Sequence, residues 1–120
     1  MNKAIMAGAL MAASLLVFTF AFAAGNVDKG KKLFNDPGFA GGSRACNSCH
    51  NNGDGLQAAG AKKEFTISGK KATSLEDAVN ICIVGANGGK AIKKDSAEMM
   101  DIVAYIKSIG SKSKKSTGGY

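Results

Sequence analysis

Apolar and polar positions follow the period of α-helices along much of this chain. After an apolar run over residues 4–24, apolar side chains recur every three or four positions in residues 26–35, 74–84 and 95–109. This spacing places them on one face of a helix. The pattern therefore predicts a small all-α domain behind an apolar leader.

The apolar leader has the features of a secretory signal peptide over residues 1–23. Lys3 provides a positive start, and Ala21-Phe22-Ala23 is a small-x-small cleavage pattern. We expect cleavage after Ala23 or one residue later, and therefore a periplasmic protein. The alternative is an uncleaved anchor, because the run is about long enough to span a bilayer. Membrane contact is expected only in that case.

Residues that stabilise helix ends stand at the borders of the periodic stretches. Asn26 or Asp28 can cap the first helix, and Ser74 can cap the second. Residues 95–98 form a similar capping pattern before the third. The predicted helices thus have defined starts.

Two polar stretches lie between and after these helices. Residues 51–73 are rich in glycine and lysine and predict a long loop that covers a cofactor. Its expected inward anchors are Leu56, Phe65 and Ile67. We expect Gly110 to end the last helix. Residues 111–120 have almost no apolar side chains and predict a disordered basic tail, which leaves residues 24–110 as the folded domain.

The charge of the chain is strongly basic. The formal net charge is +7, and loss of Lys3 with the leader reduces it to +6. This balance favours a protein partner with an acidic docking surface. Nucleic acid is not an expected partner, because the chain is exported and has no aromatic and basic binding motif. The lysines that could surround a docking surface are Lys29, Lys31, Lys32, Lys62, Lys63, Lys70, Lys71, Lys90, Lys93 and Lys94.

The motif Cys46-Asn47-Ser48-Cys49-His50 carries the clearest chemistry. Two cysteines three positions apart can form thioethers with the two vinyl groups of one haem, and the following histidine is held beneath the iron. A zinc site would need further soft ligands, and Cys82 is the only other cysteine. A redox disulfide would need a βαβ context. We therefore predict one haem c on Cys46 and Cys49, with His50 as an axial ligand.

With this motif the chain resembles the monohaem class I c-type cytochromes. Gly30 and Phe34 precede the motif on the first helix, and Tyr105 lies on the last. The resemblance implies a small cytochrome c fold, with three to five helices wrapped around one covalent haem. It also implies that the first and last helices cross at these residues, and that the protein transfers electrons.

The sequence departs from that family at two positions. No proline follows His50, although a carbonyl next to such a proline usually orients the imidazole. The stretch 85–94 before the last helix contains no methionine, although the sixth iron ligand is usually there. Because His50 is the only histidine, the sixth ligand must be another kind of residue, water, or absent.

Three kinds of residue compete for the sixth position. Met99, ahead of Met100, is one candidate, although Met99 also has the spacing of a core residue. Cys82 is another, although it also fits as a small buried residue. Lys90 and Lys93 are the nearest loop amines. Methionine would raise the reduction potential, whereas a thiolate would lower it.

The surroundings of Cys82 bear a second, local resemblance. Residues 80–83, 87–90 and 95–99 are similar to the haem domains of thiosulfate dehydrogenases and SoxA-type sulfur-oxidation cytochromes. In those proteins a cysteine at the place of Cys82 binds haem iron or carries sulfur. The resemblance implies the same two roles for Cys82.

The main functional prediction is a periplasmic electron carrier that is not an enzyme. The alternative is a haem subunit or enzyme of thiosulfate or sulfur oxidation, in which Cys82 takes part. A third possibility is a gas-binding cytochrome with an open sixth site. The identity of the sixth ligand distinguishes these functions.

Overall fold

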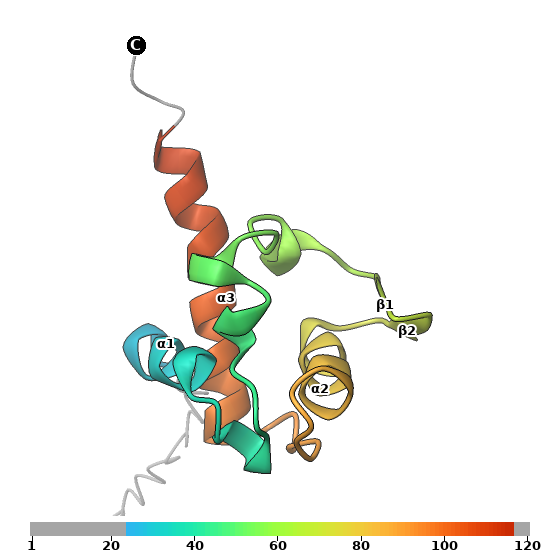
Figure 1. Cartoon of the computed structure of the whole chain (residues 1–120). Helices are drawn as coiled ribbons and strands as arrows, with labels where there is room; N and C mark the ends of the chain where they lie inside the picture. The colour runs from blue at the N-terminus through green and yellow to red at the C-terminus, as the bar shows by residue number, and fades with distance from the viewer. Residues whose placement is uncertain (1–23, 117–120) are drawn as a thin grey trace, which may run out of the picture.

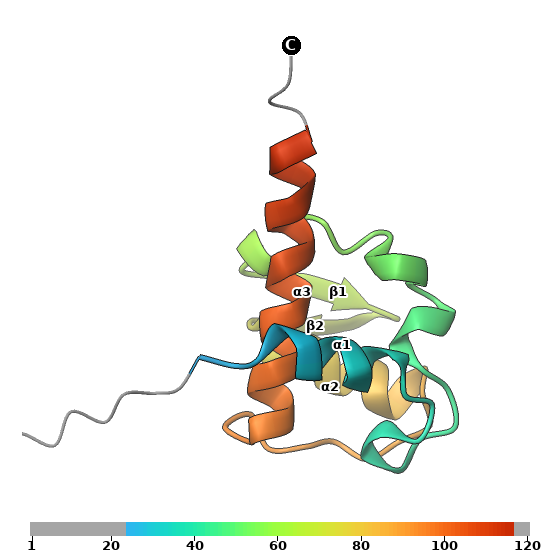
Figure 2. The same ribbon diagram turned by 90° about the vertical axis from the view of Figure 1, so that its left-hand side faces the viewer.

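The computed structural model describes residues 24–116. The predicted signal peptide and residues 117–120 of the predicted tail lie outside this range. The helices are α1 (Val27–Asn35), α2 (Leu75–Gly85) and α3 (Ala97–Ser116), and the strands are β1 (Phe65–Ile67) and β2 (Lys70–Ala72). Figures 1 and 2 show α1 and α2 on different sides of the long helix α3. Within residues 24–116, no helix is both long and apolar enough to cross a membrane.

Side-chain caps begin all three helices, as the sequence predicted. The Asn26 side chain accepts a hydrogen bond from the Lys29 amide (2.9 Å) at the start of α1. The Ser74 hydroxyl accepts one from the Asp77 amide (3.1 Å) at the start of α2. The corresponding bond in α3 joins the Ser96 hydroxyl to the amide of Met99 (3.2 Å). Each cap satisfies an amide that has no partner inside its helix.

Helices α1 and α3 cross in direct backbone contact. A Cβ atom at Gly30 would lie on the backbone carbonyl of Asp101, so only glycine fits there. Beside this contact the rings of Phe34 and Tyr105 pack edge to face, with centroids 5.1 Å apart. The backbone amide of Asn26 also donates a hydrogen bond to the Asp101 carboxylate (2.6 Å). The crossing implied by the resemblance to class I cytochromes is therefore confirmed (Figure 2).

The core lies between α2, α3 and the segment that joins α1 to α2. Its most deeply buried side chains are Phe34, Ile83, Met99 and Ile102. On α2, the buried residues Leu75, Ala78, Val79 and Ile83 belong to the face that the sequence predicted. The predicted stripe on α3 is also buried from Met99 to Ile106. The apolar periodicity thus identified the core correctly.

The stretch 51–73 is more ordered than the predicted loop. It contains short 3₁₀ turns followed by the antiparallel hairpin of β1 and β2. The two turn residues, Ser68 and Gly69, both have positive φ (50° and 77°), as a type I′ turn requires. This small hairpin is an addition to a fold that is otherwise helical.

The predicted end of the last helix is wrong, because α3 continues past Gly110 to Ser116. Residues 111–116 are therefore helical rather than a disordered tail. Glycine is tolerated inside a helix at a cost of about 1 kcal/mol. At Gly110 the absence of a side chain allows close packing, because a Cβ atom there would lie on the Gln57 carbonyl oxygen. The last turns of α3 extend beyond the rest of the fold (Figures 1 and 2).

Candidate functional site

The predicted attachment motif forms a single 3₁₀ turn. The turn spans Cys46–Ser48, and the carbonyl of Cys46 accepts hydrogen bonds from the amides of Cys49 (3.2 Å) and His50 (3.0 Å). Side chains three residues apart lie on the same side of such a turn. Cys46 is partly buried, and Cys49 is exposed. The two thiols can therefore reach one planar group whose face His50 approaches.

The orientation of His50 is set by a backbone group close in sequence. Its Nδ1 lies 3.0 Å from the carbonyl oxygen of Asp54. A carbonyl can only accept, so Nδ1 carries the proton and Nε2 is free to bind a metal. Gly53 and Gly55, with φ of +84° and +79°, shape this tight segment. The Asp54 carbonyl thus orients the imidazole of His50, as a carbonyl next to a proline usually does in the class I cytochromes.

A cavity of about 330 Å³ lies beside the motif. Cys46 and His50 form part of its wall, and most of the other lining residues are apolar. The predicted anchors Leu56, Phe65 and Ile67 all line it. Further apolar lining comes from α2 and α3, through residues that include Leu75, Ala78, Val79, Ile102 and Ile106.

Cys82 is the only candidate for the sixth position that lines this cavity. It lies on α2, on the helix face that also carries Ala78 and Val79. Burial raises the pKa of the Cys82 thiol, and the nearby Cys46 and Cys49 thiols raise it further. Without a metal the thiol is therefore held in its protonated form. Binding to a metal ion would remove that proton.

The other candidates lie elsewhere. Met99 is completely buried, and it packs in the hydrophobic core rather than at the cavity wall. Met100, Lys90 and Lys93 do not line the cavity either. One lysine does line it, namely Lys62, whose ammonium lies 5.4 Å from the centroid of the Phe65 ring. The sequence had grouped Lys62 with the lysines of the surface.

One comparison with known proteins finds a family that includes this site. The family model of the SoxA/TsdA cytochrome c domain matches residues 29–114, which include the attachment motif, the cavity and Cys82. The chain belongs to this family. It is therefore a haem protein of the cytochrome c class, with haem c as its covalently bound cofactor and electron transfer as its role. No curated protein and no solved structure shows significant similarity to the chain.

The residues of this SoxA/TsdA-type domain fit a haem. Most of the cavity lining is apolar. Its wall also includes Cys46 of the predicted attachment motif, the imidazole of His50 and the thiol of Cys82 on α2. Lys62 contributes the one ammonium group in the lining, which suits the propionate carboxylates of a haem. Bound haem supplies an iron atom that gains and loses one electron. His50 would hold that iron, and the cavity wall would shield it from water.

One residue of the site was not identified from the sequence. Asn87 is the only buried polar side chain among the described residues, and its amide donates to the sulfur of Cys46 (3.4 Å). This hydrogen bond partly offsets the effect of burial, which raises the pKa of the Cys46 thiol. In the sequence Asn87 stands in the glycine-rich end of a helix, where an asparagine is ordinary. Only the fold brings it to Cys46.

Proposed function

We propose that this protein is an exported electron carrier whose haem iron is bound by His50 and Cys82. The observation that supports this most directly is the position of Cys82 in the wall of the cavity that His50 also lines. The carrier role is further supported by the small size of the domain and its basic charge. The proposed location is the periplasm, reached through cleavage of residues 1–23.

Iron bound by a thiolate would give this carrier a low reduction potential. A thiolate brings a negative charge to the metal and stabilises its ferric form, whereas a thioether is neutral. The partly buried Cys82 thiol has no cationic partner among its described contacts to stabilise a free thiolate, so the iron itself would have to supply that stabilisation. A methionine ligand would require Met99 to leave the core, and loss of a buried methionine typically costs about 2–5 kcal/mol.

Optical spectra of both redox states test the proposed ligands. With Cys82 bound, the oxidised protein should show a thiolate-to-iron charge-transfer band and should lack the long-wavelength band of methionine-bound iron. Cys82→Ala should remove the thiolate band and raise the potential, while Met99→Leu should leave the spectrum unchanged. A spectrum that changes with Met99→Leu and not with Cys82→Ala would overturn the proposed ligand.

The proposed location has its own test. Expression of the complete chain in a bacterium should yield a periplasmic haem protein whose mass shows an N-terminus at Ala24 or Gly25. A haem protein found only in the membrane fraction, with residues 1–23 retained, would contradict it and would favour the uncleaved anchor.

A second function is favoured by the same cysteine and by the family. The surroundings of Cys82 are similar to the haem domains of thiosulfate dehydrogenases and SoxA-type sulfur-oxidation cytochromes, and the family model matches this region. Cys82 also lines the same cavity as His50, which supports a role as a sulfur carrier beside the iron. The chain would then be the haem subunit of an enzyme that oxidises thiosulfate or a related sulfur compound. Incubation of the oxidised protein with thiosulfate distinguishes the two functions. Rapid reduction that depends on Cys82 would favour the enzyme subunit, and no reduction would favour the carrier.

A further inference from the structure

Helix α2 separates the haem cavity from a groove on its opposite face. The cavity is lined from α2 by Leu75, Ala78, Val79 and Cys82, and the groove by Asp77, Asn80, Ile81 and Val84. The helical repeat of 3.6 residues places these two sets on opposite sides. The wall between the groove and the cavity is therefore a single helix.

The groove has an apolar centre. The apolar part of its lining consists of Ile81 and Val84 of α2, Ala72 of β2 and Ala91 of the loop after α2. Val84 is 48% exposed, which makes it one of the few large apolar side chains open to solvent in the described part of the chain. An apolar centre of this kind is typical of protein–protein interfaces, in which a polar rim surrounds it.

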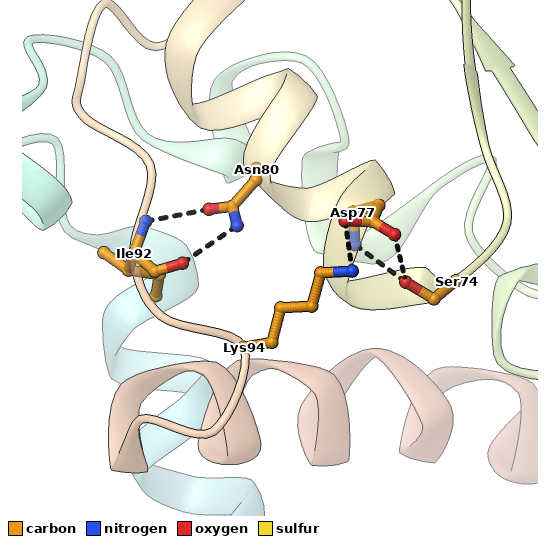
Figure 3. Close-up of polar contacts among 5 residues, drawn as sticks. All are labelled: Ser74, Asp77, Asn80, Ile92 and Lys94. Carbon is orange, nitrogen blue, oxygen red and sulfur yellow. Dashed lines mark hydrogen bonds and ion pairs between the residues drawn. The ribbon is translucent and has the colours of Figure 1, made fainter.

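The rim of the groove is basic, because its one carboxylate is already paired. Lys94 binds Asp77 through an ion pair of 2.6 Å, and the Ser74 hydroxyl donates to the same carboxylate (2.8 Å). Asn80 is also engaged, since its amide exchanges two hydrogen bonds of 2.9 Å with the backbone of Ile92 (Figure 3).

Two lysines of the rim keep their charge available. Lys70 and Lys71, on the hairpin, line the groove and are exposed. Neither has an ion-pair partner among the side chains that the structure describes. Lys90 and Lys93 are exposed on either side of Ala91 and Ile92 and add positive charge nearby. An acidic surface is the complement of this rim.

The groove is also connected to the iron site through the covalent chain. Ile81, which lines the groove, is bonded directly to Cys82, which lines the cavity. If Cys82 binds iron, a partner on the groove is linked to the metal through the side chain of Cys82 and one peptide unit. Electron tunnelling is faster through bonded atoms than through space.

We propose that this groove docks the acidic surface of a redox-partner protein, and that electrons cross helix α2 at Cys82. The inference rests on the proposed carrier function and adds the place of contact. The partner would carry carboxylates around an apolar patch that covers Ile81 and Val84. One electron moves in each encounter, from the reduced partner to the ferric cytochrome or in the reverse direction.

The test uses flavodoxin hydroquinone, an acidic protein donor, as the probe. Its rate of reduction of the oxidised holoprotein is measured by stopped flow at several salt concentrations. Lys70→Glu/Lys71→Glu should slow the reaction by about tenfold or more at low salt, and the difference should shrink as salt screens the charges. Lys31→Glu/Lys32→Glu, on α1, changes the net charge equally and should slow it less than twofold.

Two further measurements test the apolar centre and the contact itself. Val84→Ser should lower the rate at high salt as well, because it removes apolar contact rather than charge. Carbodiimide cross-linking, which joins lysines to carboxylates, should attach flavodoxin mainly at Lys70 and Lys71. Thermal unfolding of each variant shows whether the fold is retained.

Equal slowing by both lysine pairs, or cross-links concentrated on α1, would overturn the docking site. Binding of the protein to phosphatidylglycerol vesicles through Lys70 and Lys71, with no effect on the flavodoxin reaction, would show that the groove serves an anionic membrane instead. If dithionite reduces the wild-type protein but flavodoxin does not at any concentration, the proposed carrier function itself fails.

Discussion

The side-chain amide of Asn87 donates a hydrogen bond to the sulfur of Cys46, over a distance of 3.4 Å. The backbone of Asn87 makes two more connections. Its amide donates to the Cys82 carbonyl (3.0 Å), and its carbonyl accepts from the Ser43 amide (2.9 Å). A single buried residue therefore ties the haem-attachment segment to the last turn of the helix that carries Cys82.

We predict that Asn87→Leu loosens Cys82 from the iron. Leucine has the same branched shape and the same number of side-chain heavy atoms but no donor, so the hydrogen bond to Cys46 is lost and no cavity is left. If Cys82 binds the iron as proposed, imidazole added to the oxidised protein must displace Cys82 before it can bind. Its binding, followed by the change in the haem spectrum, should become several-fold faster in the variant.

Asn35→Leu provides the matched control for this change. Asn35 is exposed on α1, and its side-chain amide donates to the Lys31 carbonyl (2.8 Å). Imidazole should therefore bind this variant at the wild-type rate. Asn87→Ser keeps a donor and should recover part of the slow binding. An Asn87→Leu protein that is folded and binds imidazole at the wild-type rate would show that the hydrogen bond does not restrain Cys82.

The crossing of α1 and α3 leads to a prediction at Gly30. A methyl group in Gly30→Ala would meet the Asp101 carbonyl and Cβ of Tyr105, 2.8 Å away, so the two helices would have to separate. Overpacking of this kind usually costs about 1–3 kcal/mol of the free energy of unfolding. Urea denaturation of the holoprotein measures the loss.

Gly85→Ala is the control for this substitution. Gly85 is the last residue of α2, and a Cβ atom there has no neighbour within 4 Å. Alanine should therefore be neutral or should stabilise the protein by up to about 1 kcal/mol through its helix propensity. Equal destabilisation by both substitutions would indicate that glycine itself, and not the close approach of α3, matters at Gly30.

A substitution at Gly110 distinguishes two reasons for a glycine near the end of a helix. The glycine can end the helix, or it can allow another segment to approach closely. A glycine that ends a helix can be replaced by alanine with little loss when its φ is negative. Because Gly110 instead faces the Gln57 carbonyl, Gly110→Ala should destabilise the protein by about 1–3 kcal/mol despite the better helix propensity of alanine. Urea denaturation beside Gly85→Ala checks this, and a stabilised Gly110→Ala protein would contradict it.

The sequence was sufficient for features that depend on local pattern. The caps at Asn26 and Ser74 and the buried face of α3 follow from neighbouring residues, and the structure contains each of them. The attachment motif also follows from neighbouring residues, and the roles assigned to its residues stay predictions. Features that depend on distant contacts were not accessible. The close approach of Gln57 to Gly110 is such a contact, and without it a glycine before a polar tail predicts the end of a helix.

The site shows the same division. The candidates Cys82 and Met99 both have the spacing of buried helix residues, so periodicity could not distinguish them. In the fold their positions differ, because Cys82 lies in the cavity wall and Met99 lies in the core. The carbonyl of Asp54 could not be assigned to His50 either, because every residue has a carbonyl and only the backbone path shows which one is near.

The pair Asp77 and Lys94 predicts a dependence of stability on pH. Hydrogen bonds from Lys94 and from Ser74 lower the pKa of the Asp77 carboxyl from its ordinary value of 3.8. Folding therefore favours the ionised carboxylate. Its contribution to stability is complete above the ordinary pKa and is lost as the pH falls through the lower pKa of the folded protein.

Asp77→Asn should therefore destabilise the protein at neutral pH and have less effect in acid. Asparagine retains the size of the side chain but carries no charge for Lys94, and the wild-type carboxyl itself becomes neutral at low pH. Urea denaturation near pH 7 and again below about pH 3 should show the difference between the two proteins shrinking. Because Lys94 is 57% exposed, added salt should also reduce the difference at neutral pH.

Glu64→Gln, at an exposed position on the loop before β1, should show neither dependence. A difference between wild type and Asp77→Asn that is constant from neutral pH to acid would mean that Asp77 acts through its shape at the start of α2, and not through its charge.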